Sequence, residues 1–242
     1  IDESQRVTLS DIGTVEEIRR WASELDSEIL ELELVSQFRC NGSDGYLAWL
    51  DDVLEIRDTA NTNMKDIDYE IRIVDSPNEV RSLILERNKA ANHSRILAGY
   101  CWEWLKEGKN NSEVHDICID DFEMSWNLGN STTFAIDENS VNEVGCIHTS
   151  QGLEFDYVGV IIGDDMRYED DHIVTDFTKR AKTDQSLKGI KKIYKENPEF
   201  ALSEADEIIK NTYRTLMTRG MKGCYVYCTD KKLAEHLRKC LE

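Results

Sequence analysis

Residues 147–163 read Ile-His-Thr-Ser-Gln-Gly-Leu-Glu-Phe-Asp-Tyr-Val-Gly-Val-Ile-Ile-Gly, and this stretch decides the fold. Its second half, residues 157–163, is an apolar run bounded by glycine, which is the pattern of a buried strand. Its first half is a polar loop that this strand ties to the core. Loops fixed to a rigid sheet are where binding and catalytic groups concentrate. The same pattern also fits an ordinary turn with solvated polar residues, so spacing alone leaves both interpretations open.

Strand-like and helix-like segments alternate along the rest of the chain. The patterns predict strands at 29–35, 69–74, 95–101, 116–119, 143–148, 157–162 and 224–228, and helices at 14–25, 43–54, 76–88, 203–218 and 232–241. The alternation predicts an α/β fold whose mostly parallel sheet has helices on both faces. Residues 164–201 are charged and irregular, which indicates an insertion with its own hairpin or helix. Gly220 and Gly223 predict a turn before the last strand.

The charge of the chain is strongly negative but unevenly distributed. A net charge of −19 over 242 residues argues against a simple nucleic-acid binder, because phosphate contacts need clustered Lys and Arg. Residues 179–195 are the exception, with only Asp184 among seven basic residues: Lys179, Arg180, Lys182, Lys188, Lys191, Lys192 and Lys195. Such a run is usually a solvated face. The alternative is a surface that faces phosphate or a partner.

The cysteines and the hydropathy pattern indicate a cytoplasmic protein. The seven cysteines are odd in number and form no Cys-x-x-Cys pair, which favours free thiols in a reducing cytosol over a zinc site. No apolar run is long enough to span a bilayer, and the chain shows no signal-peptide pattern.

Three polar segments outside the opening stretch have the residue types that phosphoryl transfer needs. Asp2 and Glu3 are adjacent carboxylates, of which one can hold Mg²⁺ and the other can polarise a water. Arg39 follows a predicted strand, where its planar fork can bind phosphate oxygens, although for this residue in isolation a surface salt bridge is the favoured interpretation. Arg219 lies between a helix and a strand and can stabilise the charge on a transferring γ-phosphoryl group.

In this order the segments resemble the motor domains of superfamily 1 helicases. Asp2-Glu3-Ser4-Gln5 is similar to the Walker B motif, Gln37-Phe38-Arg39 to motif IV, residues 148–156 to motif V, and Thr218-Arg219-Gly220 to motif VI. The amino-acid sequence of residues 37–42, 97–104 and 211–228 resembles that of the uncharacterised DNA/RNA helicase domains related to the Schlafen proteins. The resemblance covers essentially the full chain.

The resemblance implies a role for each matching residue. Asp2 would hold Mg²⁺, Glu3 would activate the water, and Arg39 and Arg219 would contact the γ-phosphate. Gln5, Gln37, Gly152 and Glu154 would lie on the nucleotide side, with Glu154 at the ribose and Gly152 allowing close approach of the backbone. His148 and Thr149 would face the nucleic-acid backbone.

The resemblance also implies a fold and an activity. The chain would have a RecA-like P-loop NTPase fold, with residues 1–28 as the tail of a first lobe and 29–242 as the second, C-terminal motor lobe. The longer protein that contains both lobes would use ATP and Mg²⁺ to move on single-stranded or duplex nucleic acid.

The chain departs from the family pattern in two places. Gln151 stands where UvrD-like members carry lysine, although RecD-like members share the glutamine. More importantly, the sequence has no Gly-x-x-x-x-Gly-Lys-Ser/Thr loop, so we expect the N-terminal RecA-like lobe to supply it and this chain alone to be inactive. The alternative is a non-catalytic protein-interaction module derived from a helicase fold, with its acidic surface engaging a basic partner.

Overall fold

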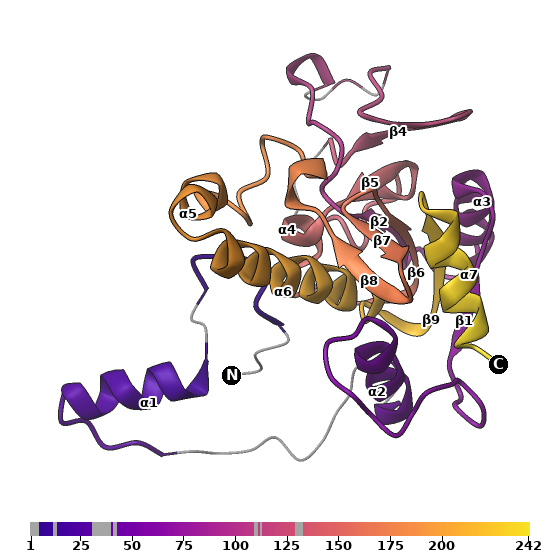
Figure 1. Cartoon of the computed structure of the whole chain (residues 1–242). Helices are drawn as coiled ribbons and strands as arrows, with labels where there is room; N and C mark the ends of the chain where they lie inside the picture. Colours follow the sequence, from indigo (N-terminus) through magenta and orange to yellow (C-terminus); the bar gives the residue numbers. More distant parts are fainter. Residues whose placement is uncertain are drawn as a thin grey trace.

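A seven-stranded sheet forms the centre of the molecule (Figure 1), in the order β1-β9-β6-β2-β5-β4-β3. The computed structural model describes residues 5–11, 14–30, 40, 43–108, 111, 113–128 and 133–242. The strands are β1 (Glu70–Ile73), β2 (Ser94–Ala98), β3 (Ile117–Ile119), β4 (Phe122–Trp126), β5 (Glu143–Gly145), β6 (Phe155–Ile162) and β9 (Gly220–Cys228). All neighbouring strands are parallel except β3 and β4. The predicted α/β fold with a mostly parallel sheet is therefore confirmed.

Helices pack on both faces of this sheet. In the described part of the chain the α-helices are α1 (Val15–Glu24), α2 (Asp44–Val53), α3 (Pro77–Asn88), α4 (Ile147–Ser150), α5 (Ile190–Glu196), α6 (Pro198–Met217) and α7 (Lys231–Lys239), and of these α1 buries no residue. Successive side chains of a strand point to opposite faces, so β6 contributes to two cores. Val158 and Val160 pack in the core that includes Leu216 of α6, whereas Ile161 belongs to the core that includes Ile84 of α3.

Gly159, in the middle of β6, allows α3 to lie directly on the sheet. A Cβ atom at this position would lie 2.3 Å from Cγ1 of Val80, which is closer than any real contact. The apolar run that predicted a buried strand thus also contains the site where a helix approaches its backbone.

Two predictions about the strands near the motifs were wrong. Residues 143–148 were expected to form one strand, but β5 ends at Gly145 and residues 147–150 form the helical turn α4. This turn is closed by a hydrogen bond from the Ser150 amide to the Cys146 carbonyl at 3.0 Å. Gly220 and Gly223 lie inside β9 rather than in a turn before it. A Cβ at Gly223 would lie 2.6 Å from the carbonyl oxygen of Glu70 in the neighbouring strand, so the close approach of the two strands accounts for the glycine there.

Residues 164–201 form both a hairpin and helical structure. The strands β7 (Met166–Glu169) and β8 (His172–Thr175) pair antiparallel, and the short 3-10 helix η6 (Phe177–Lys179) and α5 follow. α6 begins at Pro198, before the predicted start at residue 203, because Asn197 caps it by accepting from the Phe200 amide.

The N-terminal residues that the structure describes run along α6. Arg6 forms ion pairs with Glu204 at 2.6 Å and Glu207 at 3.2 Å, and Val7 is buried in the core. The Leu9 amide donates to the Ser186 carbonyl at 2.9 Å.

α1 has the predicted capping box at Thr14, and none of its residues is buried. Residues 31–35 of the strand predicted at 29–35 lie outside the described residues, and residues 29 and 30 are in no strand. In the described part of the chain, no helix has the length and apolarity needed to cross a bilayer.

Candidate nucleotide and nucleic-acid sites

The opening stretch and the segment around Arg219 meet at the amino-terminal ends of β6 and β9. The Phe155 amide donates to the Arg219 carbonyl at 2.9 Å. In return, Nη1 of Arg219 donates to the Leu153 carbonyl at 3.4 Å. Because β6 and β9 are neighbours in the sheet, two motifs far apart in the sequence are held together by backbone geometry.

A cavity of about 140 Å³, here called the Arg219 cavity, lies beside this junction. It is lined by Gln5, Val7, Ile147, Gln151, Gly152, Thr215 and Arg219. Three residues that the sequence assigned to the nucleotide side therefore share one cavity: Gln5, Gly152 and Arg219. Arg219 is 6 % exposed, so a permanent cation lines a largely desolvated space.

Gly152 keeps its part of the cavity wall open. Its φ is +77°, in the left-handed region that favours glycine, and no atom lies within 4 Å of the position a Cβ would occupy. A side chain here would therefore strain the backbone without striking protein atoms. The open space in front of the backbone is consistent with close approach by a ligand.

Thr215 is a cavity residue that the sequence reasoning missed. It is 5 % exposed, and its hydroxyl has no hydrogen-bond partner in the part of the chain that the structure describes. Leaving a buried hydroxyl unpaired costs about 1–3 kcal/mol, so an orphaned one in a cavity wall suggests a site for a polar ligand. The available signal was its position four residues before Arg219, at the same end of α6.

The other sequence-assigned nucleotide residues do not lie in this cavity. Glu154 is exposed and is not among the lining residues, so its role at the ribose stays a prediction. Asp2, Glu3, Gln37 and Arg39 lie outside the described residues.

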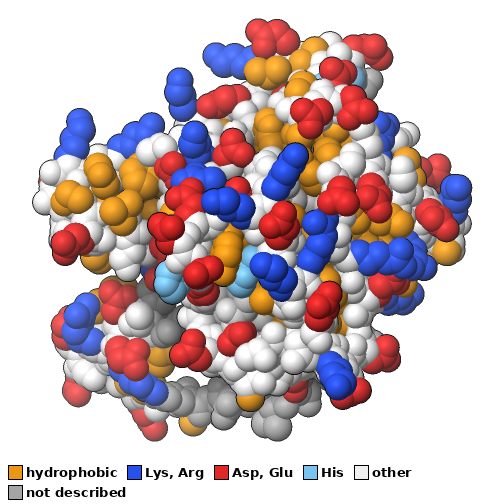
Figure 2. All heavy atoms as spheres, turned by 45° about the vertical axis from the view of Figure 1, so that its right-hand side comes forward, with side chains coloured by type: hydrophobic (Ala, Val, Ile, Leu, Met, Phe, Trp, Pro, Cys, Tyr) orange, Lys and Arg blue, Asp and Glu red, His pale blue; other side chains and the backbone are white. Residues whose placement is uncertain are grey.

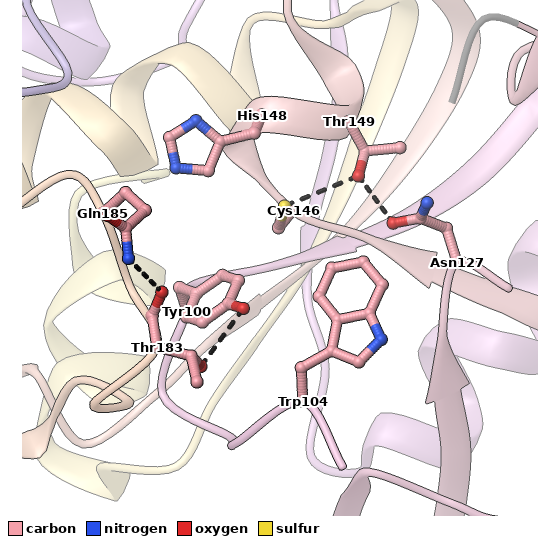
Figure 3. Close-up of a pocket in the computed structure, with 8 residues that line it drawn as sticks. All are labelled: Tyr100, Trp104, Asn127, Cys146, His148, Thr149, Thr183 and Gln185. Atoms are coloured by element: carbon pink, nitrogen blue, oxygen red, sulfur yellow. Dashed lines mark hydrogen bonds between the residues drawn. The ribbon is translucent and has the colours of Figure 1, made fainter. Parts of the chain in front are cut away.

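A second cavity of about 260 Å³, here called the His148 cavity, also borders α4 (Figure 3). It is lined by Tyr100, Trp104, Asn127, Cys146, His148, Thr149, Thr183 and Gln185. The two residues assigned to the nucleic-acid side, His148 and Thr149, are thus together and outside the Arg219 cavity. Thr149 is buried, and its hydroxyl donates to Oδ1 of Asn127 at 2.6 Å, so it positions Asn127. His148 is more exposed, at 39 % of its side chain.

A buried charge network holds one wall of the His148 cavity. Arg180 is surrounded by protein and forms ion pairs with Asp165 at 2.9 Å and Asp184 at 2.6 Å. Nε2 of His148 lies 3.9 Å from Asp184. Burial alone would raise the pKa of Asp184, but His148, Arg180 and the hydrogen bonds from Ser186 hold that pKa well below its usual range. The network fixes the loop that contributes Thr183 and Gln185 to the cavity.

Comparison with known families identifies the class of protein. Residues 1–230 match the family described as Schlafen group 3, DNA/RNA helicase domain. The chain therefore belongs to this helicase-domain family, as the motif resemblance predicted.

Two individual proteins are similar to the chain. The uncharacterized protein YPL245W of Saccharomyces cerevisiae is 27 % identical over 222 residues, which cover 84 % of this chain and 47 % of that protein. The chain thus spans about half the length of this relative. A crystal structure of the C-terminal domain of a possible DNA helicase from Lactobacillus plantarum WCFS1 aligns with 82 % of this chain and 94 % of its own, at 10 % identity and a TM-score of 0.32. That structural likeness is distant.

Proposed function

We propose that this chain is the C-terminal motor lobe of an ATP-dependent DNA/RNA helicase or translocase. The observation that carries the proposal is the convergence of Gln5, Gly152 and Arg219 on one cavity, while His148 and Thr149 line another. A motor lobe needs these two sites to be separate but adjacent, because it must couple a nucleotide to a nucleic-acid track.

The Arg219 cavity suits the terminal phosphate of a nucleotide. The guanidinium of Arg219 and the unpaired hydroxyl of Thr215 can each donate a hydrogen bond to a phosphate oxygen. The open backbone at Gly152 allows the phosphate to approach closely. The cavity volume of about 140 Å³ fits a phosphate group better than a whole nucleotide. The proposal therefore requires that most of the ATP be held by a phosphate-binding loop, which residues 1–242 do not contain.

In this proposal the chain contributes charge stabilisation and positioning. Arg219 would neutralise charge that develops on the γ-phosphoryl group as it is transferred to water. Arg39 would act with Arg219. Mg²⁺ would be held by Asp2 and the phosphate oxygens, since this ion is usually bound by one or two carboxylates together with substrate phosphates. Glu3 would orient the attacking water.

The test is nucleic-acid-stimulated ATP turnover by a longer protein that contains this lobe together with a phosphate-binding loop. Arg219→Ala should reduce turnover by about 10³-fold or more, on the scale of other arginine fingers. Arg81→Ala, at a partly exposed arginine of α3, is the matched control and should leave turnover unchanged. Undiminished turnover in Arg219→Ala would remove this residue from the site. Residues 1–242 alone should not turn over ATP.

The second candidate is a non-catalytic interaction module, and one observation favours it. Tyr194 of α5 and Phe200 and Leu202 of α6 are 41 %, 51 % and 48 % exposed, which is unusual for large apolar side chains close together in the sequence. If the longer protein lacks ATP turnover under every nucleic-acid condition, this candidate replaces the motor lobe.

For either function we propose a reducing, cytoplasmic location, which the free state of all seven cysteines supports.

A further inference from the structure

We propose that the His148 cavity binds an unstacked base of a single-stranded nucleic acid, and that exposed lysines of residues 179–195 bind the flanking phosphates. This inference rests on the proposed function and specifies its substrate. It gives a role to the basic run, which the motifs leave unexplained.

Aromatic rings form one side of the cavity, and they are held rigidly. Tyr100 stacks on Trp126 with ring centroids 5.4 Å apart and planes 13° apart, and Trp104 stacks on Trp126 at 6.1 Å and 28°. Trp126 is fully buried, and its indole nitrogen donates to the Trp102 carbonyl at 3.2 Å. Trp104 and Tyr100 line the cavity itself (Figure 3). Fixed aromatic faces of this kind stack on nucleic-acid bases without preference for one base.

Two side-chain amides, those of Asn127 and Gln185, line the cavity together with the rings. Oδ1 of Asn127 accepts from Thr149, and no partner of its Nδ2 is found among the described residues. Nε2 of Gln185 donates to the Thr183 carbonyl at 3.1 Å, which leaves its oxygen directed away from that bond. Side-chain amides hydrogen-bond the edges of bases. The cavity has therefore both a stacking surface and polar groups for a ring with donors and acceptors.

The size of the cavity favours a single base. Its volume of about 260 Å³ is just below the range of about 300–1,000 Å³ for small-molecule pockets. This space is large enough for one ring system. A base can enter only when it is unstacked and unpaired, which selects a single strand over a duplex.

The lysines lie on the same segment as one wall of the cavity. Thr183 and Gln185 line the cavity between Lys182 and Lys188. Six lysines of the run are exposed, and among the described residues none forms an ion pair: Lys179, Lys182, Lys188, Lys191, Lys192 and Lys195.

Two carboxylates close to this run, those of Asp184 and Glu103, are already engaged. Asp184 is buried against Arg180, so it does not neutralise the lysines. The carboxylate of Glu103 accepts from the Lys182 amide at 2.6 Å and the Thr183 hydroxyl at 3.2 Å, and it thereby fixes the lysine segment beside Tyr100. On the face seen in Figure 2, acidic and basic side chains are interleaved. The run thus provides local positive charge on an otherwise acidic protein.

The test is fluorescence anisotropy of the 242-residue chain with a labelled oligothymidylate, the matching oligouridylate and a blunt duplex of equal length. The chain should bind the single strands more tightly than the duplex. Trp104→Ala should weaken single-strand binding about fivefold or more, the lower end of base–aromatic stacking, without changing the salt dependence. The double variant Lys182→Ala/Lys188→Ala should reduce the slope of log K against log salt by about 1.4, because each phosphate contact to a single strand contributes about 0.7.

Two controls keep the result interpretable. Lys231→Ala/Lys232→Ala removes two exposed lysines at the start of α7 and should alter neither affinity nor slope. If circular dichroism shows that Trp104→Ala is unfolded, Trp104→Leu replaces it, since leucine fills more of the volume without an aromatic face.

Several outcomes would overturn the inference. These are a preference for the duplex, wild-type affinity in the Trp104 variant, an unchanged salt slope in the double lysine variant, or no binding of any oligonucleotide by the wild-type chain. The proposed role of Arg219 would be unaffected by any of them, because ATP turnover of the longer protein with and without Arg219 decides it separately.

Discussion

Replacing Thr215 by valine should make the chain more stable. The Thr215 hydroxyl is buried in the wall of the Arg219 cavity without a partner among the described residues, and such a group costs about 1–3 kcal/mol relative to solvent. Valine has nearly the same shape and a similar helix propensity, so the substitution removes the cost without leaving a hole. We expect the free energy of unfolding to rise by about 1 kcal/mol, which corresponds to a melting temperature about 2–4 °C higher for a chain of this size.

The matched control is Thr212→Val on the same helix. Thr212 is fully buried too, but its hydroxyl donates to the Ile208 carbonyl at 2.7 Å. Losing that bond should lower the free energy of unfolding by about 0.5–1.5 kcal/mol, so the two variants should shift in opposite directions. Urea titration followed by circular dichroism measures both. If Thr215→Val is destabilised as much as Thr212→Val, water already satisfies the Thr215 hydroxyl and the reasoning from its orphaned state fails.

Two further predictions concern the buried charge network. Arg180→Met should lower the free energy of unfolding by about 3–5 kcal/mol, because it leaves the carboxylates of Asp165 and Asp184 buried without their cation; a loss below about 1 kcal/mol in urea titration would contradict this. The pKa of Asp184 is depressed in the folded state, so its contribution to stability is present above the unfolded value of about 3.8 and declines as the pH falls below it. Between pH 4 and pH 2, about the range of carboxyl titration, the wild-type chain should therefore lose stability more steeply than Asp184→Asn, and parallel curves would refute the assignment.

Local signals in the sequence predicted the elements that depend on local interactions. Ser43 and Ser76 cap the helices that begin next to them, and the apolar run after Asp156 became β6. These features involve neighbouring residues, so a sequence pattern contains them. β4 was not predicted: its five residues include the charged Glu123, and besides the adjacent β3 it pairs with β5, which lies later in the chain.

The sites depend on distant residues, and the sequence predicted them less completely. Gln5 reaches the Arg219 cavity because the neighbouring Arg6 is paired with α6 about two hundred residues later, which no local pattern encodes. Arg180 looked like part of an exposed basic run but is buried between Asp165 and Asp184. The six lysines of the run are exposed, as the sequence indicated. Arg180 is the exception, because its ion pairs with residues of the folded chain bury it.

The mistaken strand at 143–148 matters for function, because secondary structure determines which residues share a face. If the strand predicted at 143–148 continued to residue 151, Ile147, Thr149 and Gln151 would point the same way. In the observed helical turn Ile147 and Gln151, four residues apart, both line the Arg219 cavity, whereas His148 and Thr149 line the other cavity. One turn of helix thus forms a shared wall between the two cavities. A displacement of α4 would alter both cavities at once and would thereby couple the proposed phosphate site to the proposed base site.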